Sequence, residues 1–250
     1  MIFINILLFF LIGLVFGSFF NVVGLRLPKN IPFANDRSAC PYCNHQLTWY
    51  ENIPLFSFLI QRGKCRHCKG KISYIYPTIE LFTGVLFALS FSIIGFKFEL
   101  ITALLLVSML MIIFVSDIKY MLIPNKVLLF FLPFFILMRV LVPLEPWWSP
   151  IIGAIIGVVL LAIIIILSRG GMGAGDMKLF GVLGIVLGVQ KVLLAFFLSC
   201  MIGAIIGVFL LLTKIVGRKQ PVPFGPYIVF GSLIAYFYGD TLLNWYINLL

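Results

Sequence analysis

Long apolar segments alternate with short polar ones along most of this chain. A helix of about 18–20 apolar residues is long enough to cross a bilayer. Apolar segments are predicted as helices at residues 2–25, 77–96, 99–117, 126–144, 150–168, 177–190, 191–213 and 224–249. The pattern therefore predicts an all-α polytopic membrane protein with about eight transmembrane helices, of which 177–190 is the shortest.

Only one polar segment is long enough to form a module. It occupies residues 26–76, between a first helix at 1–25 and a seven-helix membrane domain at 77–250. About fifty residues is small for a self-sufficient hydrophobic core, so we expect a bound metal to stabilise this insert. The N-terminal stretch lacks the basic region and cleavage site of a secretory signal, and it is predicted to remain as the first helix.

Composition agrees with this membrane assignment and accounts for the positive charge. Of 250 residues, 62% are hydrophobic and 10% are charged, with a mean hydropathy of +1.18 and a formal net charge of +10. If 26–75 is cytoplasmic, all but three of the 18 basic residues lie inside, the exceptions being Lys97, Arg139 and Lys191. Because short cytoplasmic loops collect Lys and Arg, both termini are predicted outside, and nucleic-acid binding is not expected.

Two acids lie at the predicted cytoplasmic ends of helices. Asp176 closes the stretch Gly-Met-Gly-Ala-Gly-Asp at 171–176 and begins one helix, whereas Asp117 ends another. Two carboxylates at one membrane face can share a proton and act as the base and the acid of an aspartic protease. Gly173 and Gly175 would let an extended substrate backbone approach Asp176.

Each acid also has a structural interpretation. Asp176 alone could be a helix N-cap, and Asp117 alone could be a solvated acid beside Lys119. Their occurrence at one face favours a dyad, in which the helix dipoles would make Asp176 the resting base and Asp117 the resting acid. A proton-coupled transporter would instead need acids near the bilayer midplane, and an internal repeat that the sequence does not show.

Four of the five cysteines form two CxxC pairs, Cys40/Cys43 and Cys65/Cys68. Four thiolates complete the tetrahedral shell of structural zinc, and the coordination energy becomes folding energy. Disulfides are less compatible with a reducing cytoplasm. His45 and His67 could each replace a cysteine, but with four thiols available we expect them to be bystanders.

Six motifs in order along the chain resemble those of the type IV prepilin peptidases of pilus, type II secretion and competence systems. They are GSFFNVVGLRLP (17–28), CPYC (40–43), ENIPLFSFLIQRGKCRHC (51–68), KISYIYPTIELFTG (71–84), SDIKYMLIPN (116–125) and GMGAGDMKLFGVLG (171–184). The resemblance implies a GxGD-type intramembrane aspartic protease whose catalytic residues match Asp117 and Asp176. Its expected partners are prepilin or pseudopilin precursors and the lipid bilayer, with cleavage at the cytoplasmic face of the bacterial inner membrane.

The resemblance also implies methylation of the new N-terminal residue with S-adenosylmethionine. Glu80, Arg26 and Asn21 match family motifs at the cytoplasmic mouth and are the methyltransferase candidates. Glu80 also has a structural interpretation, since an acid in a first helical turn complements the dipole. No glycine-rich signature for a methyl donor is visible.

Two alternatives concern the kind of activity, namely a peptidase without methylation and a protease with a different cleavage site. Family members without the cysteine-bearing insert tend to be peptidases only, so the insert favours both activities here. A presenilin-like protease that cuts inside transmembrane helices is disfavoured by the insert and by the PTIE stretch at 77–80.

Overall fold

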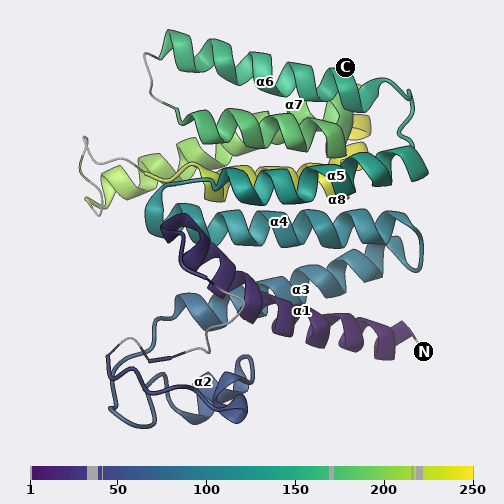
Figure 1. The fold of residues 1–250 in the computed structure, drawn as a ribbon. Helices are drawn as coiled ribbons and strands as arrows, with labels where there is room; N and C mark the ends of the chain where they lie inside the picture. Colours follow the sequence, from purple (N-terminus) through teal and green to yellow (C-terminus); the bar gives the residue numbers. More distant parts are fainter. Residues whose placement is uncertain are drawn as a thin grey trace. The chain divides into compact units, whose positions relative to one another are not determined.

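The regular secondary structure of the described residues is almost entirely helical (Figure 1). The computed structural model describes residues 2–32, 39–40, 42–168, 172–214, 217 and 222–249. The long helices are α1 (Ile2–Arg26), α3 (Ile75–Ile94), α4 (Glu99–Tyr120), α5 (Asn125–Leu141), α6 (Ser149–Leu167), α7 (Ala174–Leu212) and α8 (Gly225–Ile247). Pairing of β type is limited, in the described residues, to two isolated bridges. The predicted all-α fold class is confirmed.

Five described helices are long and apolar enough to cross a membrane. They are Ile2–Lys29, which contains α1, together with α3, α4, α6 and α7. The helices α5 and α8 fall on the apolar segments predicted at 126–144 and 224–249. The chain is a multi-pass membrane protein, built from the apolar segments that its hydropathy predicts.

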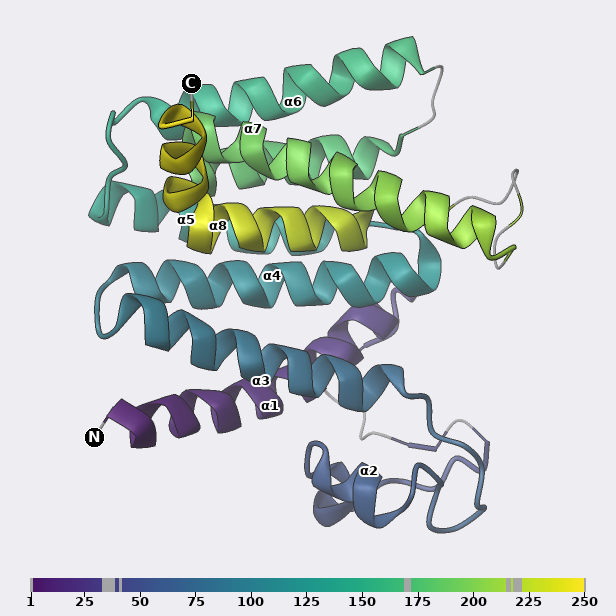
Figure 2. The same cartoon turned by 180° about the vertical axis from the view of Figure 1, so that it is seen from behind.

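The helix α7 contains two of the predicted segments. Its 39 residues would extend about 58 Å at about 1.5 Å per residue, twice the thickness of a bilayer core. Gly188 interrupts it with φ +73° and ψ −178°, a conformation that residues with a side chain rarely adopt. Figure 2 shows that the chain reverses its direction at this break, so that the two arms, 174–187 and 189–212, run in opposite directions.

Two polar side chains satisfy the backbone at this break. Arg139 is buried in α5, and its Nε and its second terminal nitrogen donate hydrogen bonds to the Val186 carbonyl at 3.0 and 2.6 Å. The Val189 N–H donates to Ser149 Oγ at 3.1 Å. Broken helices are tolerated in membrane proteins where neighbouring groups replace the missing hydrogen bonds, as Arg139 and Ser149 do here.

Two compact units divide the chain, at residues 1–100 and 101–250. In the first, α1 packs along α3, and Gly17 makes the close approach possible: a Cβ there would lie 2.8 Å from the Glu80 Cα. The insert between these helices holds the short helices η2 (Trp49–Asn52) and α2 (Phe56–Ile60). This packing brings Glu80 of α3 against α1, at the end of both helices that is continuous with the insert.

The second unit has an apolar core. Fully buried side chains from α4, α5, α6, α7 and α8 fill it, namely Leu106, Met109, Leu110, Met111, Ile113, Phe135, Leu161, Leu179, Phe180, Leu183 and Ile228. The Phe114 ring of α4 meets the Phe230 ring of α8 edge-on, with centroids 6.1 Å apart. Packing along these helices aligns the last turn of α4 with the first turn of α8.

Candidate active site and metal site

Asp117 lies in the last turn of α4 and is held by the first residue of α8. Asp117 is only 5% exposed, and the Gly225 N–H donates a hydrogen bond to Asp117 Oδ2 at 2.8 Å. A Cβ at position 225 would lie 2.5 Å from that oxygen, closer than real Cβ contacts come. Glycine is therefore required at this position if Asp117 is to keep its place.

Asp176 lies in the first turn of α7, within the second unit as well. Its residue is 8% exposed; the Gly173 N–H donates to Asp176 Oδ2 at 3.3 Å, and the Asp176 N–H donates to the Gly173 carbonyl at 3.1 Å. Gly175 faces Ile123, whose Cβ would lie 3.1 Å from a Cβ added to this glycine. Gly171 lies outside the described residues.

The fold brings the two acids together although 58 residues separate them in sequence. The Asp117 carboxylate is close enough to Asp176 to act on it electrostatically. The expected asymmetry from the helix dipoles has lost its basis, however. Asp117 ends its own helix, but its carboxylate faces the N-terminus of α8 and accepts an N–H there, as Asp176 does at the N-terminus of α7.

Gly225 is the residue of this site that the sequence reasoning missed. The available signal was the Phe-Gly-Pro tripeptide at 224–226, at the start of the last apolar segment. Proline is favoured in the first helical turn, so the tripeptide predicts a helix start. It does not predict which carboxylate the exposed N–H would meet, because the contact joins residues 108 positions apart.

The four paired cysteines converge on one site in the insert. Each CxxC pair occupies a tight turn: the Asn44 N–H donates to the Cys40 carbonyl at 2.9 Å, and the Lys69 N–H donates to the Cys65 carbonyl at 3.0 Å. Asn44 and Lys69 both have left-handed backbone, with φ of 54° and 61°. The two pairs therefore share the same closing hydrogen bond and the same left-handed residue directly after the second cysteine.

The distances between sulfurs fit a metal shell. Cys40 and Cys68 Sγ lie 3.7 Å apart, Cys43 and Cys65 Sγ lie 4.0 Å apart, and all four sulfurs are within 4.8 Å of one another. Four sulfurs about 2.3 Å from a central ion would be about 3.8 Å apart, whereas a disulfide bond is about 2.05 Å. The cluster can hold a metal ion.

The two histidines lie beside the cluster and not in it. Their rings stack with centroids 5.2 Å apart and an interplanar angle of 8°. His45 Nε2 lies 3.7 Å from Glu51 Oε2, and among the described residues only the four cysteines group as metal ligands. His45 thus contacts a carboxylate, and the candidate ligand set consists of four thiols.

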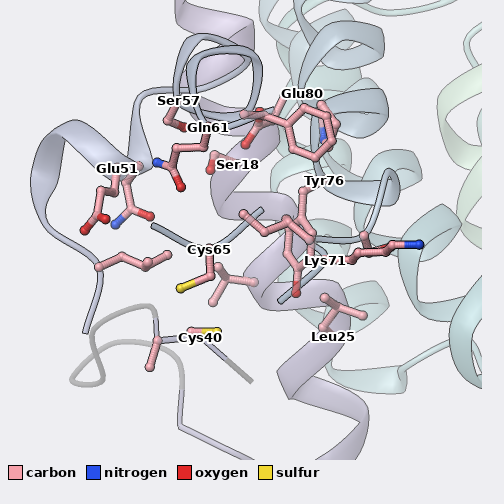
Figure 3. A pocket seen from close by; sticks show the side chains of 18 of the residues that line it. Ser18, Leu25, Cys40, Glu51, Ser57, Gln61, Cys65, Lys71, Tyr76 and Glu80 are labelled. Atoms are coloured by element: carbon pink, nitrogen blue, oxygen red, sulfur yellow. The ribbon is translucent and has the colours of Figure 1, made fainter. Parts of the chain in front are cut away.

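A cavity of about 420 Å³ lies in the first unit, between α1, α3 and the insert (Figure 3). Its walls include Ser18, Arg26, Cys40, Glu51, Gln61, Cys65, Lys71, Tyr76 and Glu80. Of the methyltransferase candidates, Arg26 and Glu80 line it. Asn21 does not, but its Nδ2 donates to the carbonyl of Tyr76, a wall residue, at 3.2 Å. The volume lies in the range of small-molecule sites, about 300–1,000 Å³.

Comparison with family models covers most of the chain. Residues 11–96 match the bacterial peptidase A24 N-terminal domain, and residues 104–208 match the type IV leader peptidase family. The boundary between the two matches falls near the division between the compact units.

Several curated proteins are similar over nearly their whole length. A Bacillus subtilis protein named prepilin leader peptidase/N-methyltransferase is 45% identical over 240 residues, 96% of this chain and 97% of its own. Proteins of the same name from Aeromonas salmonicida and Pseudomonas aeruginosa are 35% and 32% identical, over 96% and 95% of this chain and over 93% and 92% of their own. No solved structure matches the chain.

Proposed function

The chain belongs to the type IV leader peptidase family, and we propose that it removes the leader from prepilin-like precursors and methylates the new N-terminal residue. The observation that carries the peptidase half is the pair of buried carboxylates, Asp117 and Asp176, within electrostatic reach of each other. Buried acids in a membrane protein are costly, and they are typical of functional sites.

In the proposed cleavage, the two aspartates share one proton and act on a water molecule. The ionised aspartate takes a proton from water, while the protonated one donates a hydrogen bond to the carbonyl of the scissile peptide. The roles exchange as the bond breaks. The Gly225 N–H holds Asp117 for this task, and the Gly173 N–H holds Asp176. Gly173 and Gly175 are the proposed contacts of an extended substrate backbone beside Asp176, although the Cβ direction of Gly175 itself is filled by Ile123.

We further propose that the four cysteines bind structural zinc. Thiolates suit zinc, and a shell of four leaves no open coordination position for catalysis. The ion would fold the insert and so shape the cavity, because Cys40 and Cys65 belong to both.

For methylation, we propose that the cavity receives S-adenosylmethionine, which supplies an electrophilic methyl group. Glu80 and Arg26 lie in the cavity wall, and Asn21 supports the wall through Tyr76. The distribution of basic residues supports a topology in the bacterial cytoplasmic membrane with both termini outside, the dyad at the cytoplasmic face and the insert in the cytoplasm.

Co-expression with a prepilin tests both activities in one measurement. Mass spectrometry of the product reports leader loss and N-methylation together. Asp117→Asn and Asp176→Asn should each lower cleavage by more than about 10⁴-fold, as expected for members of one catalytic unit. The matched control is Asp240→Asn, since the Asp240 side chain is 77% exposed and pairs with Lys191.

Full cleavage by either dyad variant would overturn the peptidase proposal. Leader loss without methylation by the wild-type protein would confine it to the peptidase role.

A further inference from the structure

The cavity contains a buried carboxylate that makes no ion pair with any basic side chain of the described residues. Glu80 is 7% exposed and lies beside Tyr76, away from the cysteine end (Figure 3). Arg26 and Lys71 also line the cavity, yet no basic side chain among the described residues lies within ion-pair distance of Glu80. Taking a carboxylate out of water is unfavourable unless a partner compensates. Glu80 is therefore suited to a cation that enters the cavity.

The second acid of the cavity is already occupied. Glu51 Oε2 accepts hydrogen bonds from the Thr48 N–H at 2.9 Å and the Thr48 hydroxyl at 2.8 Å, and it lies near His45. The Thr48 backbone N–H keeps the pKa of Glu51 below its usual value. Glu51 thus caps η2 within the insert, and Glu80 remains as the acid directed at a ligand.

A strained turn holds Glu80 in position. Leu55 has φ +61° and ψ −50°, and the Phe56 N–H donates to the Pro54 carbonyl at 2.7 Å, which together define a γ-turn of the rare kind. The Leu55 N–H donates a hydrogen bond to Glu80 Oε2 at 2.9 Å. Backbone strain of this kind clusters at ligand sites. These contacts orient the carboxylate without neutralising its charge.

We propose that Glu80 binds the new N-terminal ammonium of the cleaved precursor and accepts its proton before methyl transfer. The inference rests on the methylation proposed above. The proton passes from the ammonium nitrogen to the Glu80 carboxylate, which leaves a neutral amine. The nitrogen lone pair then forms a bond to the donor's methyl carbon, and the electrons of the broken carbon–sulfur bond return to sulfur. Glu80 afterwards releases its proton to water.

The methyl donor also carries an ammonium and a sulfonium, so the experiment must separate two sources of positive charge. The variant is Glu80→Gln, which keeps the size of the side chain and an oxygen for the Leu55 N–H. The matched control is Glu99→Gln, because Glu99 does not line the cavity. Full-length protein is assayed in detergent with a mature, unmethylated pilin peptide, and binding of labelled S-adenosylmethionine is measured separately.

Glu80→Gln should keep donor binding and leader cleavage within about twofold and lose at least a hundredfold in methylation at pH 6.5. The loss should shrink as the pH rises past about 8, where an α-amino group deprotonates without help. A purely structural role of Glu80 would not produce this recovery. A tenfold loss of donor binding would assign the carboxylate to the donor, and unchanged methylation would remove it from the reaction; either result overturns the proposal.

A second measurement uses the wild-type protein and covers the case in which the variant does not fold. The mature peptide is compared with a des-amino analogue that lacks the terminal ammonium. The mature peptide should bind at least tenfold more tightly, and equal affinities overturn the proposal. Absence of methylation by the wild-type protein is a different outcome, which refutes the proposed methyltransferase function itself.

Discussion

The two compact units hold the polar groups of their sites in position by different means. In residues 101–250, Asp117 and Asp176 are surrounded by packed apolar helices, and each accepts an N–H at the start of a helix. In the insert of the first unit, the only buried side chains among the described residues are Cys40, Glu51 and Cys65. One site is thus held by an apolar core, whereas the other depends on the cluster of thiols.

Metal removal should produce the largest difference between the units. Cys40→Ser and Cys65→Ser should each abolish zinc binding, and the insert should unfold, since structural zinc contributes about 10–16 kcal/mol in small domains. Methylation should disappear, while the dyad should retain cleavage of an added prepilin.

Metal analysis of the purified protein checks the first part, with about one zinc expected per wild-type chain. The control is Cys200→Ser, because Cys200 lies outside the cluster. A stably folded, metal-free wild-type insert would contradict the comparison.

Gly225→Ala should produce the next largest effect, in the other unit. The added methyl group would meet Asp117 Oδ2 and displace the carboxylate. A displacement of about 1 Å commonly costs about a hundredfold in rate. We expect a loss of that order in cleavage, with methylation of a pre-cleaved peptide unchanged.

The control for this variant is Gly207→Ala, since a Cβ at Gly207 has open space around it. Equal cleavage by Gly225→Ala and Gly207→Ala would show that the N–H contact does not position Asp117.

Arg139→Met tests whether the second unit depends on polar groups as well as on its core. The Val186 carbonyl would lose its donors at the break in α7, and an unsatisfied buried group costs about 1–3 kcal/mol. Thermal unfolding in detergent should begin at a lower temperature. Lys191→Met is the control, because its ion pair with the exposed Asp240 should contribute less than about 1 kcal/mol.

The smallest expected effect concerns the cap of η2. Thr48→Ala removes the hydroxyl that donates to Glu51, and loss of a helix cap costs about 1 kcal/mol. The insert should release its metal to a chelator faster, while cleavage by the dyad stays unchanged. Ser92→Ala is a suitable control, because the Ser92 hydroxyl donates a hydrogen bond to the Leu89 carbonyl of its own helix. Release as slow as in wild type would indicate that the thiol cluster alone holds the insert.

Much of this organisation is readable from local sequence. Apolar length predicts the helices because a bilayer has a fixed thickness, and even the two arms of α7 appear as the separate segments 177–190 and 191–213. The CxxC spacing predicts the thiol cluster, because each pair closes its own short turn. Burial of Arg139 was not predicted, since its partner is exposed only by the break at Gly188.

The sequence by itself determined which segments are helical, which acids stand at helix ends and which cysteines pair. Only the tertiary structure decided which hydrogen-bond partners those groups have. Gly225 reaches Asp117 across 108 residues, and the strained turn at Leu55 reaches Glu80 across 25. The physical reason is that hydropathy and helix dipoles act within one element, whereas a hydrogen bond between elements depends on how the elements pack. Packing places the N-terminus of α8 beside Asp117, and the dipole there offsets the dipole at the C-terminus of α4.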